Sequence, residues 1–211
     1  MEIIFERLVP FLCLISAITI HEFSHALAAD KLGDPTPRSF GRLSLNPLVH
    51  ADPFGTFLLP LMSTLTGIPT IGWAKPVPID SFNFRHPKRD EIIVSLAGPL
   101  SNLSLALICA LSVRFITPLS FLGSILSYLI LINISLFIFN LLPIPPLDGS
   151  KVFLNLLSPQ SYAKWSEALD HYGIVLLLIL VFLPINNGHT LISLIMFPIV
   201  RFILNLFGLI Y

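Results

Sequence analysis

The feature that most constrains this chain is an uncharged apolar run of 24 residues, Leu119–Leu142. A helix needs about 20 apolar residues to cross the roughly 30 Å hydrocarbon core of a bilayer, so this run is long enough to span it. Charged residues make up 11% of the chain, whereas a soluble domain carries about 25%. The sequence therefore predicts an integral membrane protein. The net charge of zero gives no indication of a nucleic-acid partner.

Further apolar runs predict four more spans: Leu8–Ala29, Ile92–Phe115, Tyr172–Ile185 and His189–Tyr211. The run from Tyr172 is short and needs a turn or two from the amphipathic segment before it. Together these runs predict an all-α polytopic membrane protein with about five transmembrane helices. We expect a single membrane-embedded domain over residues 1–211.

Residues 52–70 are also apolar, but they are interrupted by Gly55, Pro60, Gly67 and Pro69. Short cytoplasmic loops carry an excess of Lys and Arg, which makes basic residues a guide to topology. If residues 52–70 do not cross, nine basic residues share one side, namely Lys31, Arg38, Arg42, Lys75, Arg85, Lys88, Arg89, Lys151 and Lys164, against Arg7 and Arg114 on the other. We therefore expect a re-entrant or interfacial segment here, packed against protein. The amino end is then outside and the carboxyl end cytoplasmic; a crossing would give six spans.

The first predicted span contains three ionisable groups, His21, Glu22 and His25, where polar side chains are costly. Helix residues four apart share one face, so both imidazoles can reach one metal ion. Glu22 then points near the open coordination position. This is the HExxH arrangement, in which the carboxylate is the general base toward a metal-activated water. The alternative is a hydrogen-bonded histidine pair, which leaves a buried Glu22 without a partner.

A catalytic zinc ion usually takes three protein ligands, so a third must come from elsewhere in the chain. Asp148 has the most unusual setting, because prolines stop the preceding span and Gly149 permits a sharp turn. An Asx turn that caps the next helix is the alternative for Asp148. If residues 52–70 do not cross, the first and third spans run the same way, which brings Asp148 to the depth of the histidines. The other candidates are His50, His86, His171, His189 and the remaining Asp residues.

These residues resemble the site-2 protease family of intramembrane zinc metalloproteases. The matching stretches are "HEFSH" in the first span, "SLAGPLSN" in the second and "NLLPIPPLDG" at the end of the third. "GRLSLNPLVHADPFGT" and "GWAKPVPID" are similar to the compact prokaryotic branch that lacks PDZ and CBS domains. The resemblance implies a three-helix catalytic core, about residues 8–157, with accessory helices over about 160–211.

The resemblance also implies roles for individual residues. It implies one zinc ion held by His21, His25 and Asp148, with Glu22 activating water. Asn140 matches an Asn that binds substrate or stabilises the oxyanion, and an interhelical hydrogen bond is the alternative. For Asn102, substrate contact is weighed against helix packing, which is favoured. Two interpretations of His50 stay open: it is a second-choice metal ligand or an ordinary loop histidine.

The predicted function is hydrolysis of a peptide bond in or near a transmembrane segment of a membrane-protein substrate, from the cytoplasmic side of the cell membrane. A helical substrate must first be unwound, because its carbonyls are hydrogen-bonded. Residues 77–81 could then pair with the extended substrate, or form a plain surface loop. Two other function classes stay open: an ion or metal transporter, and a catalytically inactive membrane scaffold of the same fold.

Overall fold

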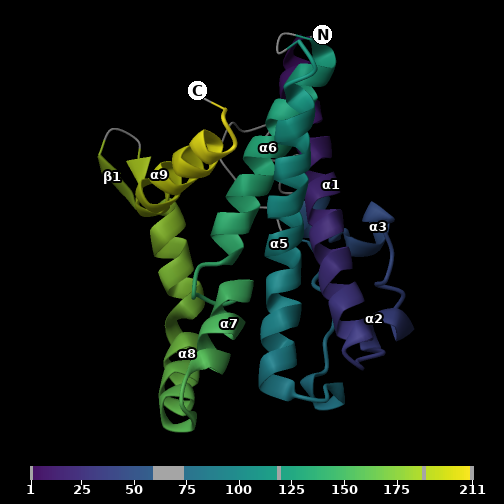
Figure 1. Ribbon diagram of the computed structural model, residues 1–211. Helices are drawn as coiled ribbons and strands as arrows, with labels where there is room; N and C mark the ends of the chain where they lie inside the picture. Colours follow the sequence, from purple (N-terminus) through teal and green to yellow (C-terminus); the bar gives the residue numbers. More distant parts are fainter. Residues whose placement is uncertain (1, 59–73, 118–119, 187–188, 210–211) are drawn as a thin grey trace.

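The protein is a bundle of long apolar helices with short irregular connections (Figure 1). The computed structural model describes residues 2–58, 74–117, 120–186 and 189–209. Within them, four helices are long and apolar enough to cross a membrane: α1 (Glu2–Lys31), α5 (Pro87–Val113), α6 (Phe121–Asn140) and α8 (Pro159–Phe182). The prediction of an all-α polytopic membrane protein is confirmed. The fifth predicted span is α9 (Leu191–Leu206), an apolar helix of 16 residues.

Short elements join the long helices. Between α1 and α5 lie α2 (Thr36–Ser39), α3 (Pro47–His50), a π-helical turn η1 (Pro53–Leu58) and a 3₁₀ turn η2 (Ser81–Asn83). The helix α7 (Asp148–Leu156) follows α6. An antiparallel pair, β1 (Pro184–Asn186) with β2 (His189–Thr190), connects α8 to α9.

Helices α1, α5 and α6 form the core of the bundle. They lie side by side, and α5 packs against both of the others (Figure 1). Alanines with almost no exposed surface, such as Ala17 and Ala26 on α1 and Ala106 on α5, let the helix backbones approach closely. Ile130 and Ile134 of α6 are fully buried against α5. Helix α9 covers the same cluster from outside with Ile203 and Leu204.

The direction of these helices sets where the third span ends. Helices α1 and α6 run the same way and α5 runs opposite to them (Figure 1). After α6 the prolines end the helix, and α7 begins at Asp148. A Cβ at Gly149 would lie 2.3 Å from the Leu141 carbonyl oxygen, so only glycine lets α7 fold back this tightly against the end of α6. The predicted sharp turn is thus present.

The segment expected to be re-entrant, residues 52–70, falls mostly outside the described residues. Its described flanks meet, however, because the backbone N–H of Lys75 donates to the carbonyl oxygen of His50 over 2.8 Å. A single crossing would separate these two residues by about the 30 Å of the hydrocarbon core. The contact therefore places the two described flanks, at His50 and Lys75, on the same side of the bundle.

The junction between α1 and the later loop is held by Asp34, whose side chain is fully buried. Its carboxylate accepts hydrogen bonds from the backbone N–H of Thr36 at 3.0 Å, the backbone N–H of Asp80 at 2.8 Å and the side-chain amide of Asn83 at 2.9 Å. Burial raises the pKa of Asp34, but these hydrogen bonds outweigh it and hold the pKa below its usual range. Asp34 thus fastens residues 80–83 to the end of α1.

We predict that Asp34→Ala lowers the free energy of unfolding by about 2 kcal/mol or more, because three donors lose a charged acceptor. The folded-state pKa is depressed, so this contribution is complete above the unfolded pKa of about 4 and is lost as pH falls through the folded value. Denaturant unfolding of the detergent-solubilised protein at neutral and acidic pH measures the difference. The exposed Asp170 provides the control variant Asp170→Ala. A penalty that grows toward acidic pH would contradict the assignment.

Candidate metal centre

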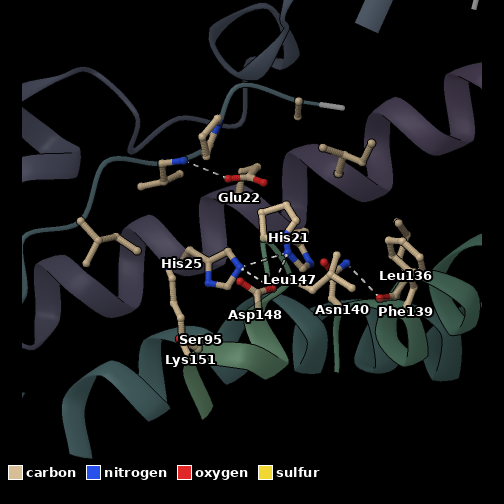
Figure 2. A pocket seen from close by; sticks show the side chains of 16 residues that line it. His21, Glu22, His25, Ser95, Leu136, Phe139, Asn140, Leu147, Asp148 and Lys151 are labelled. Atoms are coloured by element: carbon tan, nitrogen blue, oxygen red, sulfur yellow. Dashed lines mark hydrogen bonds and ion pairs between the residues drawn. The ribbon is translucent and has the colours of Figure 1, made fainter. Parts of the chain in front are cut away.

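Three side chains from opposite ends of the sequence converge inside the bundle (Figure 2). The Nε2 atoms of His21 and His25 lie 3.0 Å apart, and each lies 3.2 Å from Oδ2 of Asp148. Both histidines are buried, and Asp148 is largely enclosed. Among the described residues, these three form the one group of His, Cys, Asp or Glu ligand atoms close enough to hold a metal ion.

The spacing of the three atoms fits a zinc ion. Ligands at about 2.0–2.1 Å from a tetrahedral zinc ion are about 3.3 Å from one another. The donor set, two imidazoles and one carboxylate, is also one that zinc takes in catalytic sites, with a fourth position left open.

The hydrogen bonds behind the imidazoles point to the same conclusion. Nδ1 of His25 lies 2.7 Å from the carbonyl oxygen of Val94, and Nδ1 of His21 lies 2.6 Å from Oδ1 of Asn102. Since both partners accept, Nδ1 carries the proton on each ring and Nε2 is free to bind a cation. Two protonated rings 3.0 Å apart would repel each other, whereas one metal ion satisfies both nitrogens and the carboxylate.

Asp148 brings a carboxyl group to the two imidazoles. A carboxyl group binds a metal ion in its ionised form, and Oδ2 lies 3.2 Å from Nε2 of each histidine. Asp148 therefore supplies the negative charge that a divalent cation in this enclosed site requires.

Glu22 faces the same cavity, on the opposite side of the imidazoles from Asp148 in the view of Figure 2. Its Oε2 accepts a hydrogen bond of 3.2 Å from the backbone N–H of Val77. The cavity has a volume of about 410 Å³, enough for water and a segment of substrate. Asn140 and Lys151 also line it.

Residues 74–80 form one wall of this cavity as irregular backbone. The backbone N–H of Val77 contacts Glu22, and that of Asp80 contacts Asp34. Pro76 and Pro78 have no N–H to offer. The structure thus places this segment beside the metal centre; the prediction that it pairs with a substrate strand is not tested by these contacts.

The other predicted residues lie at different distances from the centre. Asn140 lines the cavity, and its amide donates to the Leu136 carbonyl of its own helix over 3.0 Å. Asn102 is fully buried behind His21. His50 is the buried last residue of α3, with Nε2 2.8 Å from the Ser44 carbonyl oxygen, and it does not belong to the three-residue group.

Three residues of the site were not singled out individually from the sequence, although Gly98 lies in the matching stretch "SLAGPLSN" and Val77 in residues 77–81. Gly98 of α5 packs directly against both imidazoles, Asn133 of α6 hydrogen-bonds to Asn102, and Val77 contacts Glu22. Asn133 carried a signal, because an Asn within an otherwise apolar span needs a buried partner. The contacts of Gly98 and Val77 depend on how the helices and loop pack and have no local signature.

This membrane protein brings the two histidines and the glutamate of an HExxH motif to one cavity, together with the carboxylate of Asp148 as a third candidate ligand. These are the parts of a membrane metalloprotease. Comparison with known families agrees, since the sequence profile of "Peptidase family M50" matches residues 117–182, which include Asp148. The chain belongs to this family of site-2 proteases, as the resemblance predicted.

Curated relatives match over a larger part of the chain. The chain is 39% identical over 191 residues to "Putative zinc metalloprotease YwhC" of Bacillus subtilis, covering 85% of this chain and 84% of the relative. It is 33% identical to "Putative zinc metalloprotease Rip2" of Mycolicibacterium smegmatis, over 81% of this chain and 65% of the relative, and 31% identical to Rip2 of Mycobacterium tuberculosis, over 82% and 66%. No solved structure gave a significant match.

We predict that Gly98→Ala abolishes metal binding while the helices stay folded. An added Cβ would lie 2.3 Å from Nε2 of His25 and 2.7 Å from Nε2 of His21, so the rings would have to move away from their common centre. Alanine itself favours a helix over glycine by about 1 kcal/mol, so α5 should persist. Zinc content per purified chain and far-UV circular dichroism measure the two effects. Full zinc content in the variant would show that the rings tolerate displacement.

Proposed function

We propose that this protein is a zinc-dependent intramembrane endopeptidase that cuts a peptide bond in or near a transmembrane segment of a membrane-protein substrate. The observation that carries the proposal is the convergence of Nε2 of His21, Nε2 of His25 and Oδ2 of Asp148 within 3.2 Å, with Glu22 in the same cavity. In this proposal one zinc ion is held by these three side chains.

In this proposal the protein's own residues transfer the protons and contact the substrate. When bound, zinc supplies Lewis-acid activation of water and of the substrate carbonyl. Glu22 takes a proton from the attacking water and returns it to the leaving amine. Asn140, whose amide group lies at the cavity, is placed to contact the substrate backbone or the oxyanion.

The depth of the site supports an intramembrane substrate. His25 and His21 precede the end of α1 at Lys31 by six and ten residues, which is about 9 and 15 Å along a helix. Both therefore lie within the roughly 30 Å hydrocarbon core if Lys31 is at its boundary. A substrate helix must open there before its carbonyls can react.

The orientation we propose follows from charge. The end of the bundle nearest the site carries Lys31, Lys88 and Arg89, whereas Arg114 lies at the other end, close to the start of α1. By the positive-inside rule the site opens toward the cytoplasm and the amino end lies outside. Water could then reach Glu22 through the cavity from the cytoplasmic side.

The proposal is tested by Glu22→Gln. This variant should keep wild-type zinc content, because Glu22 is not one of the three ligands, and lose about 10²–10⁴-fold in cleavage rate, because the base is gone. The assay uses the full chain in proteoliposomes with a reporter whose transmembrane helix carries a fluorophore on each side. A chelator should abolish wild-type cleavage, and added zinc should restore it.

Two outcomes would overturn the proposal. Wild-type protein without bound zinc would remove the metal centre, and equal cleavage by wild type and Glu22→Gln would remove the mechanism. Zinc or proton flux through the wild-type protein without cleavage would instead favour the transporter interpretation.

The contact between Val77 and Glu22 yields a second prediction. Val77→Pro deletes one N–H within a segment already flanked by Pro76 and Pro78, so the carboxylate loses a donor that holds it toward the cavity. A hydrogen bond to a charged group contributes about 1.5–3 kcal/mol, which corresponds to a loss of roughly tenfold or more in kcat.

The matched control is Val77→Ala, which keeps the N–H and shortens the side chain. Single-turnover cleavage of the same reporter separates the two variants. If Val77→Ala is as slow as Val77→Pro, the side chain rather than the N–H matters, and the positioning role is wrong.

A further inference from the structure

Two asparagines are buried at the centre of the three-helix core. Asn102 of α5 and Asn133 of α6 each have no exposed surface. Their side chains hydrogen-bond to each other, and Asn102 also reaches His21 on α1. A polar contact thus crosses all three core helices in a region that is otherwise apolar. Burying two amides in such a region is costly unless each is fully hydrogen-bonded.

Backbone carbonyl groups determine which atom donates and which accepts in each hydrogen bond between Asn133, Asn102 and His21. Nδ2 of Asn133 donates to the Leu129 carbonyl at 2.8 Å, so its Oδ1 must face Asn102. Nδ2 of Asn102 donates to that Oδ1 at 2.8 Å and to the Ala17 carbonyl at 3.2 Å. Backbone carbonyls only accept, so neither amide can rotate by 180° without losing its partners.

Oδ1 of Asn102 is consequently turned toward Nδ1 of His21, 2.6 Å away. An acceptor at this position holds the proton on Nδ1 and leaves the lone pair of Nε2 directed at His25 and Asp148. If the Asn102 amide rotated, its NH₂ group would face Nδ1. His21 would then carry its proton on Nε2, the atom that must bind the metal.

His25 differs from His21 in this respect. Its Nδ1 faces the Val94 backbone carbonyl, which cannot exchange donor for acceptor. Only His21 depends on a side-chain amide. Two acceptors oppose rotation of that amide, the Ala17 carbonyl at 3.2 Å and Oδ1 of Asn133 at 2.8 Å, and the contact with Asn133 is the shorter.

We propose that Asn133, through Asn102, is a positioning residue that sets the metal-binding tautomer of His21. The proposal rests on the zinc centre of the proposed function. It assigns Asn133 a role although that residue contacts neither the metal centre nor the cavity. The competing explanation is that Asn133 only ties α5 to α6.

The first test is the zinc affinity of Asn133→Leu, which keeps a side chain of similar size and removes the acceptor for Asn102. Loss of such an outer partner typically costs 10–100-fold in metal affinity, and we expect at least tenfold here. The full chain is purified in detergent, stripped of metal and titrated with zinc against a competing chelator. The control is Ser127→Ala on the same helix, whose hydroxyl donates only within α6, to Gly123; its zinc affinity should be unchanged.

A double-mutant cycle with Asn102→Asp separates tautomer control from helix packing. A carboxylate accepts through both oxygens, so it offers His21 an acceptor in either orientation, but it has no donor for Asn133 or for the Ala17 carbonyl. In the Asn102→Asp background Asn133→Leu removes an acceptor that the carboxylate cannot satisfy, so it should lower zinc affinity by no more than about twofold, although it costs at least tenfold alone. An equal loss in both backgrounds would show that Asn133 acts through packing and would overturn the proposal.

Nitrogen NMR of histidine-labelled, zinc-free protein at alkaline pH gives a readout that packing would not move. His21 should carry its proton on Nδ1 in the wild type and on Nε2 in Asn133→Leu. The same NMR measurement is made on the double variant Asn102→Asp/Asn133→Leu. Its carboxylate restores an acceptor for His21, so the proton should return to Nδ1, which tests the proposal even where Asn133→Leu alone is unstable.

The outcomes distinguish the two proposals. A wild-type protein that binds no zinc contradicts the proposed function. A wild-type protein that binds zinc, with equal affinity in Asn133→Leu and an unchanged His21 tautomer, contradicts only the role of Asn133.

Discussion

The rest of the structure depends on holding two imidazole nitrogens and one carboxylate oxygen about 3 Å apart inside an apolar bundle. Each of these three side chains needs a fixed orientation, because the apolar interior holds little water that could hydrogen-bond to a misplaced polar atom. Helix α5 supplies most of this support: the Val94 carbonyl and the Asn102 amide hold the two rings from behind, and Gly98 leaves room for both against the helix. Gly149 does the same for Asp148, by letting α7 fold tightly against the end of α6.

Residues 74–80, which form one wall of the cavity, are also held by hydrogen bonds: their backbone N–H groups donate to acceptors on other segments. Lys75 donates to His50, Val77 to Glu22 and Asp80 to Asp34. Two of these three acceptors are carboxylates, which form the stronger kind of hydrogen bond. The loop after α1 is therefore tied both to the end of that helix and to the proposed base. The position of residues 74–80 and the orientation of Glu22 are therefore coupled.

Much of the site could be predicted from local sequence. The four-residue spacing of His21 and His25 specifies a shared helix face, and the prolines and glycine around Asp148 specify a turn at the end of a span. Local sequence could not connect Asp148 with the histidines, because 122 residues lie between it and His25, the nearer of the two; an argument about topology was needed. Asn102 was noticed as a motif residue, but its partner could not be named, because hydrogen bonds between helices depend on rotation and depth that apolar spans do not encode.

The sequence by itself determined the class of protein, its long apolar helices and the side chains proposed to hold the metal, because hydrophobic length and helical periodicity are local properties. Tertiary structure alone decided which groups stand behind the ligands. Gly98 faces the imidazoles, Asn133 orients Asn102, and Val77 reaches Glu22 only because of the packing of α5, α6 and residues 74–80 against α1. Such contacts arise from the relative placement of segments far apart in the chain, and no pattern within any one segment specifies them.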